Sequence, residues 1–357
     1  MKFGKLKFIS STIFLLMTIS AHAQSGVTLS GLLGMGVSYT SNASPVGSGA
    51  LFQASNTHAV PFFAMSGKEV IDSDTSAIFR LSRYAFLNNG TDAPFESFVG
   101  LSSASQGTLT MGSMYDLLAD LVPFTSERYT SLLATHPGNL DRTVGNSLNN
   151  SFKYKSPLYG GFQFGLMYGF GQAGSTTNTG RVVGAEVAYA TGPWQSVAVW
   201  ESVNGVPYTP GLKLGVPTLY GIDFTKTPTA SVSQNQNTGT VGIAYADDGW
   251  RVMGNYSYTR LSANGVSATA QSIDVGAYKY VTLRTRIGGG YSYTKLETYR
   301  WNQFHAHIDY ALSKRTSLYV LGVLQLAGSG QFAVLRNQPP ASASHQTVLE
   351  AGITHFF

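Results

Sequence analysis

Long segments of alternating apolar and polar residues run through this chain and constrain its fold more than any other feature. Between Val27 and Tyr39 one face carries Val27, Leu29, Leu33, Met35, Val37 and Tyr39. The segments 162–170 and 250–259 repeat the pattern. A period of two puts successive side chains on opposite faces of a β-strand, and about ten residues suit a tilted strand that crosses a membrane. One face of each strand would then meet lipid and the other water.

The composition agrees with a membrane barrel and excludes several other classes. Charged residues make up 11% of the chain, against about a quarter in ordinary soluble domains. Glycine, tyrosine and phenylalanine number 40, 20 and 20. Beyond the N-terminal segment, no apolar stretch approaches the roughly 20 residues of a transmembrane helix. Cysteine is absent, which excludes disulfides and thiolate metal sites.

The first residues predict export from the cytoplasm. Lys2, Lys5 and Lys7 precede an apolar run from Phe8 to Ile19, and Ala21-His22-Ala23 follows as a cleavage site. We therefore predict a signal peptide over 1–23 and one barrel domain over 24–357, with a retained membrane anchor as the alternative. Removing the three lysines lowers the net charge from +5 to +2. No basic cluster remains, so we predict no nucleic-acid partner.

Turn-forming residues divide the chain into candidate strands. The predicted strands are 27–40, 58–66, 76–86, 95–103, 107–115, 148–156, 161–171, 181–190, 194–202, 238–246, 249–260, 271–281, 284–295, 302–311, 315–326 and 346–357. Short turns alternate with longer polar segments near 41–57, 116–147, 203–236, 260–270, 296–301 and 327–345. The prediction is an all-β fold, a 16-stranded antiparallel transmembrane β-barrel, with 14 or 18 strands as alternatives.

Several motifs, in order along the chain, resemble the general porins of β-proteobacteria. They are Phe98-Val-Gly-Leu-Ser-Ser103, Gly107-Thr-Leu-Thr-Met-Gly112, His136-Pro-Gly138, Asn149-Asn-Ser-Phe-Lys-Tyr154, Met167-Tyr-Gly-Phe-Gly171, Leu312-Ser-Lys-Arg-Thr316 and Gly352-Ile-Thr-His-Phe-Phe357. The resemblance implies a trimeric 16-stranded barrel in the outer membrane of a Gram-negative bacterium, surrounded by outer-membrane lipid. It also implies a third loop that folds inward, and passive diffusion of small hydrophilic solutes and ions.

Three positions depart from this family. Its members usually carry arginine where this chain has Ser113, Ser147 and Thr354. Since hydroxyls replace three expected cations, we hypothesise a pore that is less anion-selective than its relatives.

Charged residues of the pore are predicted from the resemblance and from strand parity. If the loop 116–147 folds inward, its carboxylates would form the acidic side of a constriction: Asp116, Asp120, Glu127 and Asp141. A charge that faces lipid near the bilayer centre costs about 2–4 kcal/mol, so basic residues of the wall are expected inside. The predicted basic side is Arg80, Arg142, Lys153, Arg251, Arg284 and Arg286.

The last strand, 346–357, alternates to a terminal aromatic residue. Leu349, Ala351, Ile353 and Phe357 are predicted to face lipid. The ending also resembles the signal by which the outer-membrane assembly machinery recognises barrels, and Phe357 is the predicted signal residue.

Other functions have weaker support in the sequence. His305, His307 and Asp309 share one strand face, an arrangement that a hydrolase or a metal site could use. Asp309 is close to the short turn 312–315, away from the long loops, so we predict no enzyme. No cofactor motif occurs, and no cofactor or metal is predicted. A substrate-selective channel of the same fold, or a barrel for surface recognition through the loops 203–236 and 327–345, remain the alternatives.

Overall fold

The computed structural model describes residues 26–43, 49–55, 58–126, 131–171 and 179–357. The predicted signal peptide and Glu127 lie outside this part of the chain. Among the described residues, no helix combines the length and the apolar character that a bilayer crossing requires.

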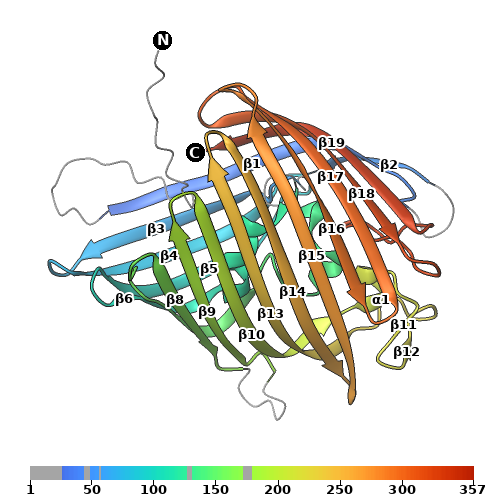
Figure 1. Cartoon of the computed structure of the whole chain (residues 1–357), viewed down its shortest axis with the longest axis horizontal. Helices are drawn as coiled ribbons and strands as arrows, with labels where there is room; N and C mark the ends of the chain where they lie inside the picture. The colour runs from blue at the N-terminus through green and yellow to red at the C-terminus, as the bar shows by residue number, and fades with distance from the viewer. Residues whose placement is uncertain (1–25, 44–48, 56–57, 127–130, 172–178) are drawn as a thin grey trace.

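Strands make up most of the molecule (Figure 1). Their bounds are β1 (Gly26–Thr40), β2 (Leu51–Ser55), β3 (Phe62–Val70), β4 (Thr75–Phe86), β5 (Thr91–Ser103), β6 (Gly107–Tyr115), β7 (Ser147–Lys155), β8 (Phe162–Gly169), β9 (Val182–Thr191), β10 (Trp194–Tyr208), β11 (Thr218–Leu219), β12 (Ile222–Asp223), β13 (Val232–Asp247), β14 (Trp250–Ala263), β15 (Val266–Tyr280), β16 (Thr285–Leu296), β17 (Tyr299–Ala311), β18 (Thr316–Ala327) and β19 (His345–Phe356). The helices are short: η1 (Leu117–Phe124), η3 (Leu132–Ala134), η4 (Pro137–Asn139) and α1 (Pro210–Leu214).

The main sheet is a closed antiparallel barrel of sixteen strand positions. β2 and β3 share one position, because β2 pairs with Gly36–Thr40 of β1 and β3 pairs with Gly26–Leu32. β11 and β12 pair only with each other, outside the barrel sheet. β19 pairs with β1 and closes the ring, as a barrel in a membrane requires. The predicted 16-stranded barrel is confirmed, and each predicted strand corresponds to one of these positions.

The chain's last residue takes part in this closure. The Phe357 nitrogen donates to the Gly31 oxygen and the Gly31 nitrogen donates to the Phe357 oxygen, both at 3.1 Å. A side chain added at Gly31 would meet the Phe357 ring at 2.5 Å. The aromatic ring therefore lies directly against β1 at the closing seam.

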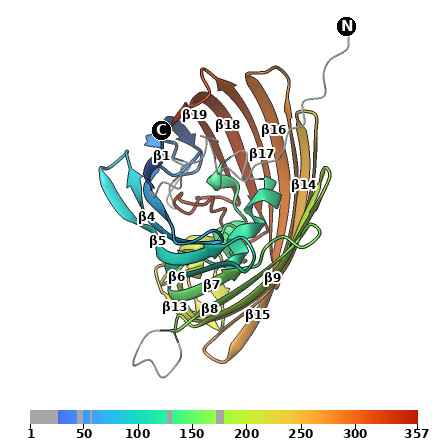
Figure 2. The same ribbon diagram turned by 90° about the vertical axis from the view of Figure 1, so that its left-hand side faces the viewer.

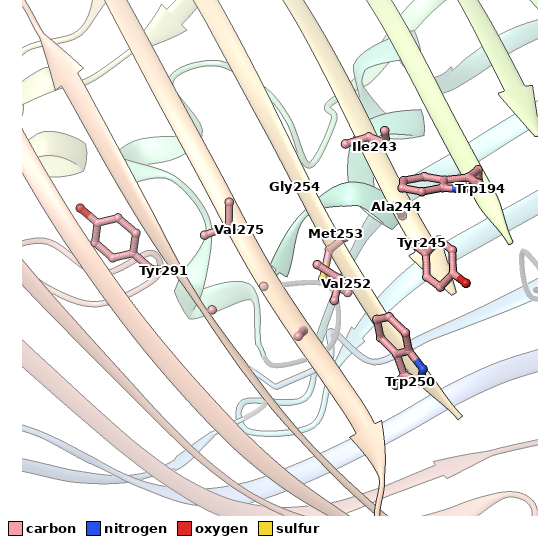
Figure 3. Close-up of a pocket in the computed structure, with 13 residues that line it drawn as sticks. Trp194, Ile243, Ala244, Tyr245, Trp250, Val252, Met253, Gly254, Val275 and Tyr291 are labelled. Atoms are coloured by element: carbon pink, nitrogen blue, oxygen red, sulfur yellow. The ribbon is translucent and has the colours of Figure 1, made fainter. Parts of the chain in front are cut away.

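The outer face of the barrel is apolar, as the alternation predicts. Val27, Leu29 and Val37 are each more than 60% exposed, which is the exposure expected of side chains that meet lipid. A groove of about 930 Å³ is lined by residues of β10, β13, β14, β15 and β16, and Figure 3 shows its side chains. Three aromatic residues lie along one end of it, Trp194, Tyr245 and Trp250, with ring centroids 4.9 and 5.2 Å apart. Such an aromatic cluster is typical of the girdle at a membrane interface.

Several connections differ from the sequence prediction, and β2 lies within the predicted loop 41–57. The segments 260–270 and 296–301 were predicted as longer loops, but tight turns at 264–265 and 297–298 join the strands there. Asn264 and Glu297 adopt positive φ values of 52° and 53° in these turns. The flanking strands run past the predicted ends because their polar alternation continues, and water-exposed hairpins tolerate such residues.

Candidate functional site

The described parts of the third external loop, 116–126 and 131–146, fold into the barrel, as predicted. Figure 2 shows its green coils inside the ring of strands. Leu117, Leu118 and Leu121 of η1 are fully buried. They pack on inward side chains of the wall: Met167, Val182, Val197, Val199, Ala244 and Met253. This patch of the inner wall is apolar, whereas a water-filled lumen needs polar lining. Burial of the patch under η1 therefore holds the loop against β8–β10 and β13–β14.

Glycines in the wall make room for the loop. A side chain added at Gly242 would meet Phe124 Cβ at 2.6 Å, and one at Gly276 would meet Ser126 Cβ at 2.3 Å. A side chain added at Gly290 would meet Ser126 Cβ at 2.4 Å. Real Cβ contacts are never so short, so the loop backbone can approach the wall this closely only because these positions lack side chains.

Gly276→Ala is expected to push the third loop away from the wall, into the lumen. Overpacking of this kind costs about 1–3 kcal/mol, and the displaced loop should lower single-channel conductance as well as the melting temperature of the folded protein. Gly239→Ala is the matched control, because no atom lies within 4 Å of a side chain added there. Equal conductance and melting temperature in both variants would contradict the close packing of Ser126 against the barrel wall.

A buried ion cluster fixes the base of the loop. Arg142 donates from Nη2 to Asp116 Oδ2 and lies 3.0 Å from Glu201 Oε1 of β10. Glu201 also accepts from the Leu117 nitrogen at 3.1 Å, and Asp116 accepts from the Asn146 nitrogen at 3.1 Å. Arg142, Asp116 and Glu201 are at most 2% exposed. Arg142 was predicted on the basic side of the pore, but it belongs to the loop itself and neutralises the buried carboxylates.

A second ion cluster joins η1 to β7 and β9. The Lys155 ammonium donates to Asp120 Oδ2 and Glu186 Oε1. The side chain of Glu186 is 2% exposed, whereas that of Asp120 is 42% exposed. Asp120 therefore touches the water of the lumen while it is neutralised by Lys155.

A third cluster attaches the far part of the loop to β14, β15 and β17. His136 Nδ1 lies 2.6 Å from Asp141 Oδ2, and Asp141 also accepts from Ser257 Oγ at 2.5 Å. His136 Nε2 lies 3.5 Å from Asp274 Oδ2 of β15. Ser126 approaches the same region: its nitrogen donates to Asp274 Oδ1 at 3.0 Å and its Oγ lies 2.8 Å from His305 Nε2. Asp141 is thus buried between loop and wall.

The eighth external loop, 328–344, also folds inward. Ala333 and Leu335 are fully buried, and Leu335 lies in one cluster with Leu133 and Ala134 of the third loop. Glutamines of the wall hold its backbone: Val334 donates from its nitrogen to Gln325 Oε1 at 2.6 Å, and Leu335 donates to Gln346 Oε1 at 2.9 Å. Arg336 Nη1 donates to Thr135 Oγ1 at 3.1 Å. Two inward loops therefore shape the lumen.

The fifth external loop, 209–231, packs on the third loop from the outer end. The Tyr208 hydroxyl donates to the Gly138 oxygen at 3.2 Å, and Leu214 is buried in one cluster with Leu140. Lys213 of α1 lies over the Tyr208 ring, with the Lys213 Nζ 4.9 Å from its centroid. Burial lowers the pKa of Lys213, and the nearby charge of Arg336 lowers that pKa further. Two cations of different loops thus lie close together.

The remaining predicted basic residues lie in different environments. Arg80 of β4 has its Nε 3.4 Å from Glu96 Oε2 and donates to Ser66 Oγ at 3.3 Å. Arg251 of β14 is 2% exposed and donates to the Pro123 oxygen at 3.1 Å, so it supports η1. Arg286 of β16 donates to Asp309 Oδ2 at 2.8 Å. Lys153 is half-buried on β7.

Arg284 of the predicted basic side lies outside the strands. It is exposed in the turn between β15 and β16, outside any strand. The turn places its side chain at the rim of the barrel, so it does not line the wall.

Two positions that depart from the family pattern lie next to each other. Ser113 Oγ is 3.1 Å from Ser147 Oγ, across the β6–β7 pair. Thr354 is buried at 6% exposure on β19, with Gly34 of β1 opposite it. These positions hold neutral hydroxyl groups in the wall.

Several residues of this site were not predicted: Glu96, Lys155, Glu186, Glu201, Asp274 and Arg336. Glu186, Glu201 and Asp274 occupy inward positions on predicted strands, and parity applied to carboxylates as well as to arginines would have found them. Val197 and Val199 carried another signal, because the apolar run 197–200 breaks the alternation where the third loop packs.

A closed 16-stranded antiparallel barrel with a loop folded into its lumen is the architecture of an outer-membrane diffusion channel. The family model described as Gram-negative porin matches residues 10–322, and the chain belongs to this family. It is an outer-membrane porin, a channel for passive diffusion of small hydrophilic solutes and ions, and not an enzyme.

Individual relatives agree in fold. Outer membrane porin protein 32 of Delftia acidovorans is 24% identical, covering 95% of this chain and 96% of that protein. The solved structure of an anion-selective porin from Comamonas acidovorans covers 94% of this chain and 100% of its own, with a TM-score of 0.79 and 20% identity. The trimer form of OmpT, an outer membrane protein of Vibrio cholerae, covers 93% and 99%, with a TM-score of 0.66 and 11% identity.

Proposed function

We propose that this porin works as a homotrimer, in which each barrel passes solutes through the space between the two inward loops and the β3–β6 side of the wall. The observation that carries this proposal is the position of the third loop. Its apolar helix η1 and its three ion clusters bind it to the inner faces of β7–β10 and β13–β17. Among the described residues, no ion pair joins it to β3, β4 or β5.

The proposed constriction differs from opposed rings of acidic and basic residues. Asp116 and Asp141 belong to the loop and are buried between it and the barrel wall. There they are neutralised by Arg142 and His136. Arg80 pairs with Glu96 on the opposite wall. Since paired charges attract permeating ions weakly, we propose a modest overall ion preference, below that of relatives that carry the three missing arginines.

Single-channel recording in a planar bilayer tests this function. Purified protein is expected to insert in units of three equal conductance steps, because each trimer adds three pores. Under a KCl gradient, the reversal potential is expected to stay far from that of an ideal anion channel. A protein that inserts without conductance would favour a role in surface recognition, and single unitary steps would contradict the trimer.

We further propose that residues 1–23 are removed on export and that the outer-membrane assembly machinery recognises the C-terminal strand through Phe357. The pairing of Phe357 with Gly31 supports a role for this residue at the closing seam. The inward packing of the fifth and eighth loops leaves less of their surface for a cell-surface partner, which disfavours recognition as the main role.

A further inference from the structure

An aromatic cluster lines the lumen on the β3–β6 side of the wall. The rings of Tyr84 and Phe95 are stacked, with centroids 4.4 Å apart and planes 17° apart. Phe62 and Tyr115 meet the Phe95 ring edge-on at 5.5 and 5.4 Å. These four residues are neither buried nor fully exposed. Their rings therefore form an aromatic surface on this side of the wall, with Gly145 of the third loop next to the Tyr115 ring.

A β-bulge brings this surface into the lumen. The β4–β5 register shifts between Leu81 and Arg83, so that Phe95 and Glu96 together oppose Ser82. The Ser82 Oγ accepts from the Glu96 nitrogen at 3.0 Å. Two consecutive residues of a bulge can point to the same face, and here Glu96 reaches Arg80 while Phe95 reaches Tyr84. Strict alternation would have sent Phe95 out into the lipid.

Hydroxyl groups and a cation accompany the rings. The Tyr84 and Tyr115 hydroxyls lie 2.5 Å apart and form a polar edge of the cluster. The charge of Arg336, from the eighth loop, acts on both hydroxyls and on Lys213. Arg336 donates to Thr135 of the third loop, and no described carboxylate forms an ion pair with it or with Lys213.

This cation differs from three other arginines of the lumen. Arg80, Arg142 and Arg286 each pair with a carboxylate. The guanidinium of Arg336 thus keeps donors for an anion, in a position where aromatic rings form the neighbouring surface. A guanidinium binds carboxylates through paired hydrogen bonds, and aromatic rings bind other flat rings by stacking.

We propose that these groups form a recognition site for planar aromatic monoanions, with the ring of the solute against Phe95 and Tyr84 and its carboxylate on Arg336. The inference rests on the proposed diffusion function and adds a solute class to it. Bulk chloride would gain little from the site, because only a solute with both a flat ring and a negative charge uses both parts.

Current block in planar bilayers tests the site with three probes. Benzoate carries both features, cyclohexanecarboxylate has the charge without the flat ring, and benzyl alcohol has the ring without the charge. Benzoate is expected to reduce the KCl current with a half-blocking concentration on the order of millimolar, as for a weak transient site. Cyclohexanecarboxylate should need several-fold more, and benzyl alcohol should leave the current unchanged.

Two substitutions separate the parts of the site. Arg336→Gln is expected to raise the half-blocking concentration of benzoate about ten-fold, as for loss of one charge-assisted hydrogen-bonding partner. Phe95→Leu keeps the charge and should abolish the difference between benzoate and cyclohexanecarboxylate. Arg315→Gln is the control, because it removes one cation from an exposed turn at the other end of the wall.

The outcomes distinguish this inference from the proposed function. Normal KCl conductance with equal block by benzoate and cyclohexanecarboxylate would overturn the aromatic site and leave the pore intact. Unchanged benzoate block in Arg336→Gln would overturn the role of that cation. Absence of KCl conductance in the wild type would contradict the diffusion pore itself. Trimers that stay folded before heating confirm assembly of each variant.

Discussion

Replacing Arg142 with alanine is expected to detach the base of the third loop and to turn a steady channel into a fluctuating one. The substitution leaves Asp116 and Glu201 buried without their cation. Removing one partner of a buried ion pair costs about 3–5 kcal/mol. The barrel has its own hydrogen-bonded framework, so this cost should appear as movement of the loop, seen as rapid opening and closing in single-channel records.

The controls for Arg142 follow from its partners. Arg284→Ala removes an arginine of the same size from an exposed turn and should leave the channel steady. A triple variant with Arg142→Met, Asp116→Asn and Glu201→Gln removes all three charges together and should recover much of the lost steadiness, because neutral groups of similar shape can replace a buried ion cluster. Arg142→Ala records as steady as those of the wild type would show that η1 alone holds the loop.

The barrel could be predicted from the sequence because each strand lies between lipid and water. That contrast makes residue parity informative at every position, so Val27, Leu29 and Val37 identify the lipid face without any knowledge of their neighbours. The strand ends were less predictable. β14 and β15 continue to the turn at 264–265, beyond the region where lipid sets the pattern.

The charged residues of the pore could not be paired from the sequence. Parity shows that a residue points inward, but not whether it meets water or a folded loop. Arg251 points inward and supports η1. Asp116 and Asp141 belong to the loop and are buried between it and the barrel wall. Phe95 was beyond reach for another reason, since the bulge at Ser82 reverses the parity on which the prediction rests.

Deleting Phe357 is expected to lower the yield of assembled trimers in the outer membrane several-fold. A moderate loss of folding stability changes the cellular abundance of proteins by about this factor. The deletion removes the hydrogen-bonded pair with Gly31 and the ring that lies on it. It should leave the conductance of each assembled pore unchanged, because the ring lies on the outer face, 39% exposed. Heat-modifiable trimers in membrane fractions measure the yield.

Two further variants separate recognition of Phe357 from its packing. Phe357→Ala keeps the backbone pair but removes the ring. Gly31→Ala keeps the terminal aromatic residue and displaces its ring, because the new methyl group would lie 2.5 Å from that ring and 2.6 Å from the Phe62 oxygen of β3. If the assembly machinery reads the ring, Phe357→Ala loses yield in cells yet refolds like the wild type in detergent, and Gly31→Ala assembles in cells with a lower melting temperature. If the ring acts only by closing the barrel, both variants lose yield together, in cells and in detergent, because the same contact between β1 and β19 is lost in each.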